Sequence, residues 1–176
     1  YYIGIEETGY YGIASTVASI LLMLIGAGMN VLRPIIYENL KLGNRKKQIN
    51  NLTFKFITGL FVCAILLSLA TPYLYKYMIN EKFHVSITTT YPLIFGLFFL
   101  GMFNYFISFL MYQKRNKIIG IVTIFGIIIN FILNYYLIKQ YGMIGAAYAT
   151  FTTYFAIGIF VIIINLLTPI SYSISE

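Results

Sequence analysis

Long apolar runs alternate with short polar segments along the whole chain. Five runs of 20 to 25 residues contain no Asp, Glu, Lys, Arg or His, and they occupy positions 12–32, 56–75, 88–112, 118–138 and 143–167. A helix rises 1.5 Å per residue, so roughly 20 residues cross a hydrocarbon core about 30 Å thick. The pattern predicts an all-α fold, a polytopic transmembrane bundle with about five membrane-spanning helices.

Composition agrees with lipid as the solvent of this chain. Of 176 residues, 60% are hydrophobic and only 10% are charged, which is more apolar surface than one soluble core could bury. We find no sequence repeat and no low-complexity linker, so we predict a single membrane domain over residues 1–176. Residues 1–5 form a short apolar segment, which we interpret as the end of an earlier helix. We therefore expect the chain to be the carboxyl-terminal part of a larger membrane protein.

The basic residues predict how the chain is oriented. Nine of the twelve Lys and Arg residues lie in segments 33–55 and 114–117, and the other three are Lys76, Lys82 and Lys139. Because Lys and Arg are retained on the cytoplasmic side of membrane helices, the first two segments are predicted to be cytoplasmic. The amino end is then outside and the carboxyl end inside. This role accounts for the net charge of +7, and we expect no nucleic-acid partner.

The segments between the runs carry further expectations. Segment 33–55 is predicted to be the longest loop, and its basic stretch 45–51 either lies on the inner leaflet as a surface helix or acts only as a topology signal. The turn at 139–142 is predicted to make the tightest hairpin, with Gly142 at positive φ. Small residues four apart, Gly145 and Ala149, predict close helix packing.

Tyrosines cluster near the predicted membrane interfaces, where they are expected to form the aromatic belt of a chain that has no tryptophan. The members of this predicted belt are Tyr10, Tyr11, Tyr73, Tyr75, Tyr77, Tyr91, Tyr112, Tyr135, Tyr136 and Tyr141.

Catalytic chemistry is poorly represented. The chain has no aspartate, one histidine, one cysteine, and glutamates that all lie outside the apolar runs. We therefore predict that it is not an enzyme and has no metal or cofactor site. His84 has only Glu81 near it in sequence and is expected to be a solvated loop side chain. Cys63 is expected to be small apolar filler.

The polar residues inside the apolar runs are amides and hydroxyls. Asn130 and Asn134 are four apart and share a helix face, as do Asn104 and Ser108. Such stripes either bond neighbouring helices or line a wet path. At the cytoplasmic side, Arg33 either keeps its head in water or, with Lys55, attracts a phosphate. The candidate substrate path consists of Asn30, Arg33, Lys55, Asn104, Asn130 and Asn134.

Two segments resemble motifs of polysaccharide-biosynthesis membrane proteins. Residues 6–15, EETGYYGIAS, lead into an uncharged helix that ends at Arg33-Pro34, and they are similar to that family's E-x-G-x-Y-x-x-A…P stretch. Residues 134–150, NYYLIKQYGMIGAAYAT, are similar to its N-x-x-L-I-x-x-Y-G-x-x-G-A-A-x-A-T hairpin. On these motifs the chain resembles the Wzx-like branch of the multidrug, oligosaccharidyl-lipid and polysaccharide exporter superfamily.

The resemblance implies a multi-pass transporter of the bacterial inner membrane. Such proteins have twelve or fourteen helices in two pseudo-symmetric bundles and flip an undecaprenyl-pyrophosphate-linked oligosaccharide for O-antigen, capsule or related polysaccharide biosynthesis. The implied partners are membrane lipid, the lipid-linked oligosaccharide, and an amino-terminal helical bundle of the same protein. The alternatives are a multidrug exporter of the same superfamily, a membrane glycan polymerase and a non-transporting scaffold. The resemblance implies no catalytic residue.

Overall fold

A computed structural model describes residues 4–42 and 46–167, and within these ranges every regular element is a helix. The order is α1 (Ile5–Lys41), α2 (Lys46–Met78), the 3-10 helix η1 (Glu81–Ser86), α3 (Ile87–Tyr112) and α4 (Asn116–Leu167). Four of these helices are long and apolar enough to cross a membrane. The all-α expectation is confirmed, and the predicted inside tail, 168–176, lies outside the described residues.

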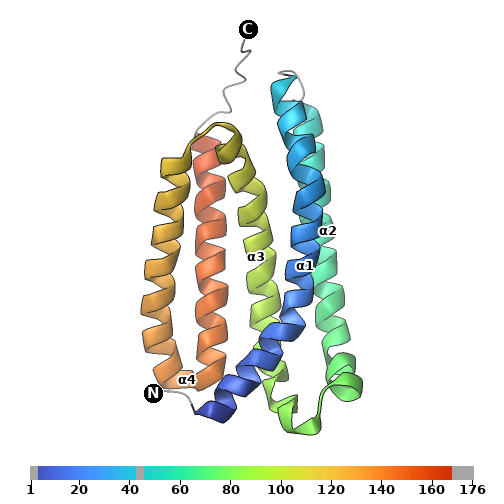
Figure 1. The fold of residues 1–176 in the computed structure, drawn as a ribbon, viewed down its shortest axis with the longest axis vertical. Coiled ribbons are helices and arrows are strands. Elements are labelled where there is room, and N and C mark those ends of the chain that lie inside the picture. Colours follow the sequence, from blue (N-terminus) through green and yellow to red (C-terminus); the bar gives the residue numbers. More distant parts are fainter. Residues whose placement is uncertain (1–3, 43–45, 168–176) are drawn as a thin grey trace.

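Helix α4 is two antiparallel arms rather than one rod (Figure 1). Its 52 residues are interrupted at Gly142, where φ is 58° and ψ is −135°. The Ile157 side chain packs beside Gly126, and Asn130 is hydrogen-bonded to Thr153, so the sequence numbers rise in one arm as they fall in the other. The predicted hairpin and the positive φ of Gly142 are confirmed. The apolar runs 118–138 and 143–167 occupy separate arms.

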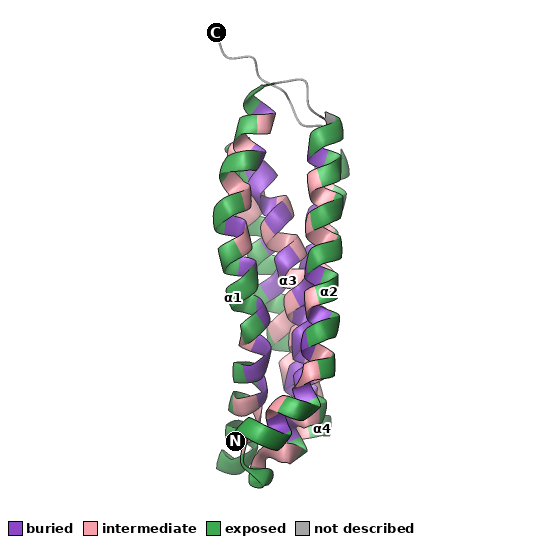
Figure 2. Cartoon of the chain, turned by 90° about the vertical axis from the view of Figure 1, so that its right-hand side faces the viewer, coloured by how far each residue is buried: buried purple, intermediate pink, exposed green. Residues whose placement is uncertain are grey.

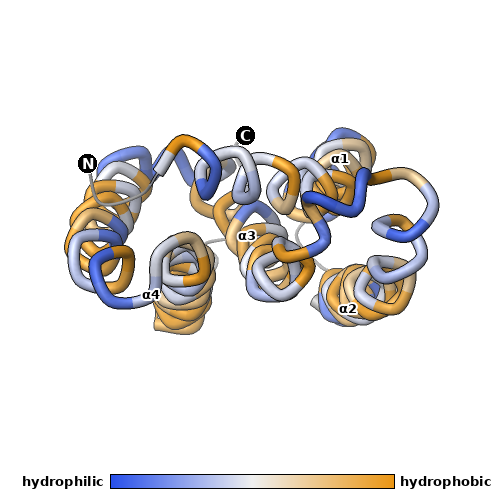
Figure 3. The backbone as a smooth tube through the Cα atoms, turned by 90° about the horizontal axis from the view of Figure 1, so that it is seen from below, coloured by the Kyte–Doolittle hydropathy of each residue, from blue (hydrophilic) through white to orange (hydrophobic). Residues whose placement is uncertain are grey.

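Helix α3 is the centre of the bundle. Figure 3 shows it between α4 on one side and α1 and α2 on the other. Glycines allow this close packing: a Cβ at Gly96 would come within 3.1 Å of the Phe151 backbone in α4, and one at Gly101 would run into Ile25 and Leu60. Because neither glycine carries a side chain, α1, α2 and α4 can all approach α3 closely.

The prediction of a loop over residues 33–55 is wrong for most of that segment. Helix α1 continues through Pro34 to Lys41, and α2 begins at Lys46. Proline removes one backbone hydrogen bond, but Ile36, Leu40 and Ile49 are buried together in the core, so packing holds the helices beyond the apolar runs. Residues 46–51 are the first turns of α2, while 43–45 lie outside the described residues.

At the opposite end, two more expectations are wrong. Tyr75 is not a belt residue: it is 1% exposed, and its hydroxyl lies 2.9 Å from Ser86 Oγ and 2.8 Å from Thr90 Oγ1. His84 is half-buried rather than solvated, with Nε2 2.8 Å from the Tyr75 carbonyl oxygen and 3.1 Å from that of Ile79. Carbonyls only accept, so Nε2 carries the hydrogen and donates to the end of α2.

The outward faces of the helices are apolar and exposed. Figure 2 shows exposed residues along the outside of α1 and α2, and α2 presents Phe61, Leu66 and Leu69 there. The first arm of α4 exposes Ile121, Ile124 and Ile128 in the same way. Continuous apolar surface of this kind is unfavourable in water and is what lipid contact requires.

Candidate functional site

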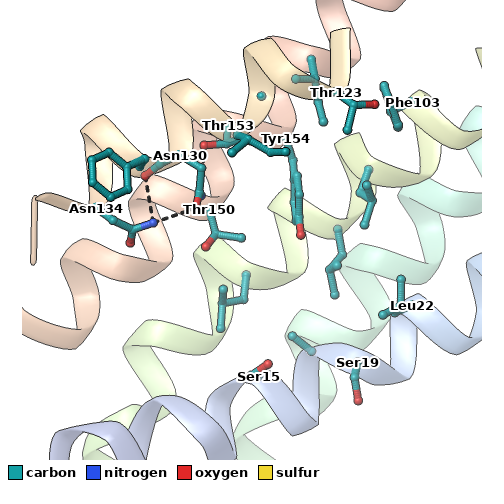
Figure 4. A pocket seen from close by; sticks show the side chains of 18 of the residues that line it. Ser15, Ser19, Leu22, Phe103, Thr123, Asn130, Asn134, Thr150, Thr153 and Tyr154 are labelled. Atoms are coloured by element: carbon teal, nitrogen blue, oxygen red, sulfur yellow. Dashed lines mark hydrogen bonds between the residues drawn. The ribbon is translucent and has the colours of Figure 1, made fainter. Parts of the chain in front are cut away.

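Helices α1 and α4 diverge over α3 and leave a cavity of about 710 Å³ between the three helices (Figure 4). Its floor is apolar and comes from α3, through Leu93, Leu97 and Leu100, which recur at helical spacing. Its walls combine apolar with polar side chains. We call it the amide cavity, and the polar side chains of its walls are Tyr11, Ser15 and Ser19 of α1 and Thr123, Asn130, Asn134, Thr150, Thr153 and Tyr154 of α4.

Hydrogen bonds organise the α4 wall of the amide cavity. Asn134 Nδ2 donates to Asn130 Oδ1 at 2.8 Å and to the Asn130 carbonyl oxygen at 2.9 Å. Asn130 Nδ2 in turn donates across the hairpin to Thr153 Oγ1 at 3.2 Å. The predicted shared face of Asn130 and Asn134 is confirmed. The two readings of this stripe are compatible, because one pair of amides both bonds the arms together and lines the cavity.

One hydrogen bond joins the α1 wall to the α4 wall. Thr150 Oγ1 donates to the Ala146 carbonyl at 3.0 Å, so the Tyr11 hydroxyl, 3.4 Å away, is the donor to Thr150 Oγ1. Tyr11 was predicted to be a belt residue, but it is half-buried at this cavity. Nearby, a Cβ at Gly142 would come within 2.9 Å of Glu7 Oε2. The amino end of α1 is thus seated on the α4 hairpin.

A second, smaller cavity of about 310 Å³ adjoins the first. Leu22 lines both, and the polar lining of the smaller one is Asn30, Arg33 and Asn104. Asn104 Nδ2 donates to the Leu100 carbonyl of its own helix at 3.0 Å. Arg33 Nε is buried and has no hydrogen-bond partner in the described part of the chain. We call this cavity the arginine pocket.

Lys55 lines neither cavity. It is exposed on α2, whose neighbouring residues Thr53 and Phe56 face the core: Thr53 Oγ1 lies 2.8 Å from the Tyr105 hydroxyl, and the Phe56 ring stacks on the Tyr105 ring. Successive helical positions are about 100° apart, so Lys55 points away from this contact. Five of the six candidate residues line the two adjoining cavities, and Lys55 lies elsewhere.

Comparisons with protein-family models, curated proteins and solved structures found no match. The site must therefore be judged on its own chemistry. Among the described residues no group of three or more His, Cys, Asp or Glu side chains could hold a metal ion.

Sequence reasoning missed five polar lining residues of the amide cavity: Tyr11, Thr123, Thr150, Thr153 and Tyr154. Thr150, Thr153 and Tyr154 are spaced three and four apart in the last arm, which is a one-face pattern that the sequence shows. Tyr11 carried no such signal, because a tyrosine near a helix end looks the same whether it meets lipid headgroups or another helix.

Proposed function

We propose that this chain is part of a membrane transporter that flips a lipid-linked oligosaccharide across the bacterial inner membrane. The observation that carries the proposal is the pair of adjoining cavities on one face of the bundle. The arginine pocket is lined by the Arg33 cation and by amides, and the amide cavity is lined by hydroxyls and amides as well as apolar side chains. A phosphate-linked sugar has this same division, with a charged group next to a neutral, hydroxyl-rich one.

The arginine pocket suits the phosphate. Arg33 presents a guanidinium whose Nε has no partner among the described residues, and Asn30 offers an amide from the preceding turn of α1. Phosphate oxygens only accept hydrogen bonds and pair well with the planar guanidinium. A phosphate left unpaired away from water costs several kcal/mol, so one positioned cation matters.

A multidrug exporter of the same superfamily is supported less well. The leucine floor of the amide cavity would suit an amphipathic drug. However, the charged side chain at the two cavities is Arg33, and no described acidic side chain lines either one to attract a cationic compound. The charge at the site therefore favours an anionic cargo.

We propose five membrane crossings, with α1, α2, α3 and each arm of α4 crossing once. Each arm has about 25 residues, enough for a core of about 30 Å. The α1–α2 and α3–α4 junctions lie at one end of the bundle, and η1 and the Gly142 turn lie at the other (Figure 1). The basic junctions are thus at one end, as the cytoplasmic assignment requires.

Cysteine labelling tests this orientation. In a Cys63→Ala background, Lys41→Cys should resist a membrane-impermeant thiol reagent applied to intact cells with a permeabilised outer membrane, and Glu81→Cys should react. Both positions are exposed, so access differs only by membrane side. The reverse labelling pattern would contradict the assignment.

Complementation tests the transport function. The complete protein containing this chain should restore surface polysaccharide in a cell whose own flippase is deleted. Arg33→Gln should lower the restored amount by about tenfold or more, the equivalent of 1.4 kcal/mol. Lys55→Gln is the matched control, because it removes the same charge near the same membrane face but outside both cavities. Equal effects of the two substitutions at normal protein abundance would contradict the assignment of the arginine pocket.

A further inference from the structure

The amide cavity is uncharged, and its lining combines hydrogen-bonding groups with apolar side chains. None of the described residues that line it is Asp, Glu, Lys, Arg or His, although nine of them carry a hydroxyl or an amide. Figure 4 shows these groups on two sides of the cavity, with Ser15 and Ser19 on α1 and the other labelled polar residues on α4. A ligand here would meet hydrogen-bonding groups on both sides and no counter-ion on either.

The internal hydrogen bonds leave mostly acceptors open in this cavity. Ser19, Thr123, Thr150 and Thr153 each donate their hydroxyl hydrogen to a carbonyl of their own helix. The oxygens of Ser19 and Thr123 therefore remain as acceptors, while Thr150 and Thr153 already accept from Tyr11 and Asn130 and can each accept one more bond. Asn134 uses its Nδ2 group on the Asn130 oxygens, which leaves Asn134 Oδ1 as an acceptor. The bond to a backbone carbonyl fixes this orientation, because a carbonyl oxygen cannot donate.

Open donors are fewer. The hydroxyls of Ser15 and Tyr154 make no hydrogen bond within the described residues, and Asn130 keeps one N–H after donating to Thr153. Neutral sugars carry many hydroxyl donors, which an acceptor-rich wall satisfies. A carboxylate carries only acceptors, so in this cavity it would face oxygen lone pairs and lose its hydration without a compensating cation.

We propose that the amide cavity selects uncharged, hydroxyl-rich glycans and disfavours acidic ones, an inference that rests on the proposed flippase function. The two cavities then divide the cargo between them. Donors in the arginine pocket meet the phosphate, acceptors in the amide cavity meet the sugar hydroxyls, and Leu22 lies at the boundary.

A transport assay in two hosts tests the selectivity. Both hosts lack their own flippase; one makes a neutral repeat unit and the other a repeat unit that contains a uronic acid. The complete protein should restore at least about tenfold more surface polysaccharide in the neutral host, relative to each host's native flippase, a difference of 1.4 kcal/mol. Equal restoration in both hosts would overturn the selectivity and leave the flippase function standing. No restoration in either, with the protein inserted normally, would overturn both.

Two lysine substitutions, one inside the amide cavity and one outside it, test whether the cavity sets the selectivity. Ser15→Lys adds a cation to the α1 wall, while Thr16→Lys adds one at the next position, which is exposed and lines neither cavity. Ser15→Lys should raise the acidic-to-neutral transport ratio by about tenfold at equal abundance, and Thr16→Lys should leave it within about twofold. The same change from both substitutions would show that the cavity does not set the selectivity.

Binding provides a readout independent of transport. In lipid nanodiscs, the protein should transfer NMR saturation to N,N′,N″-triacetylchitotriose but not to trigalacturonate, and Ser15→Lys should gain the signal to trigalacturonate. An equal signal to both ligands from the unmodified protein would overturn the selectivity whatever the transport result.

Discussion

Gly145 is the position where one added methyl group should do most damage to the α4 hairpin. A Cβ built on Gly145 overlaps the carbonyl oxygen and carbon of Leu137 in the facing arm. These are backbone atoms, so no side-chain rotation relieves the overlap, and one arm must move. Overpacking costs about 1–3 kcal/mol, and an overlap that only backbone movement can relieve belongs in the upper half of that range, about 2–3 kcal/mol.

Helix propensity acts in the opposite direction and can be measured separately. Alanine is favoured over glycine inside a helix by about 0.5–1 kcal/mol. Gly59 in α2 supplies the matched control, because a Cβ there meets nothing within 4 Å. We therefore expect Gly59→Ala to be neutral or slightly stabilising, and Gly145→Ala to be destabilising by about 1–2 kcal/mol after the propensity gain is subtracted.

The chain carries its own reporter for this measurement. Cys63 is a free, half-buried thiol on α2 that packs against the core, so it becomes reactive when the bundle opens. With a thiol-reactive fluorophore in detergent, Gly145→Ala should lower the midpoint temperature by about 2–8 °C, since 1 kcal/mol corresponds to about 2–4 °C for chains of this size. An unchanged midpoint for Gly145→Ala alongside an unchanged Gly59→Ala would show that the arms do not approach as closely as described.

Three further predictions follow from other contacts. Tyr75→Phe removes the hydroxyl shared with Ser86 and Thr90 and should destabilise the bundle by about 1–3 kcal/mol, whereas Tyr77→Phe, at an exposed site, should shift the same thermal midpoint by less than about 2 °C. Glu6→Gln breaks the 3.6 Å ion pair with Lys82, and because both side chains are exposed it too should change the midpoint by less than about 2 °C. This chain expressed alone should fail to restore surface polysaccharide in a flippase-deleted cell. Arg33 is the charged side chain that lines its cavities, and because Arg33 lies beyond the predicted span 12–32 it cannot accompany a phosphate to the middle of the membrane. Restoration at normal abundance would contradict the need for a second bundle.

The long apolar helices of the fold could be predicted from the sequence because the absence of charged residues marks them directly. All five apolar runs lie within helices, and the turn at Gly142 divides the last two runs. Helix ends were not predictable in the same way. Backbone hydrogen bonding does not stop where hydrophobicity stops, and α1 continues to Lys41 because Ile36 and Leu40 find partners in the core.

The parts of the candidate site that could be predicted are those in which the residues lie on the same helix, because their spacing shows which of them share a face. The spacing of Asn130 and Asn134 predicted a shared face, and both residues line the amide cavity. Asn30 and Arg33 are three apart and line the arginine pocket together, although no shared face was predicted for them. Asn104 and Asn30 line the same cavity because of how α3 packs against α1, which no spacing within one helix reports. The prediction for Lys55 was wrong because contacts with another helix decide which face of α2 points inward. Thr53 and Phe56 contact Tyr105 of α3, and this turns Lys55 away from the cavities.

The two segments that carry the family resemblance meet in space at one end of the amide cavity. Tyr11 of the first donates to Thr150 of the second, and Glu7 of the first occupies the space beside Gly142 of the second. Gly142 is constrained twice, by its positive φ and by the Glu7 carboxylate, so a side chain there would disturb both the turn and the seat of α1. Much of each segment therefore specifies how α1 sits on the hairpin and holds that end of the cavity. Three groups that would discriminate between cargoes, Ser19, Asn130 and Arg33, lie outside the two segments, whereas Thr150 takes part in the contact and also lines the amide cavity. It follows that substitutions at Glu7 or Gly142 should act on assembly of the bundle, while substitutions at the cavity walls should act on the choice of glycan.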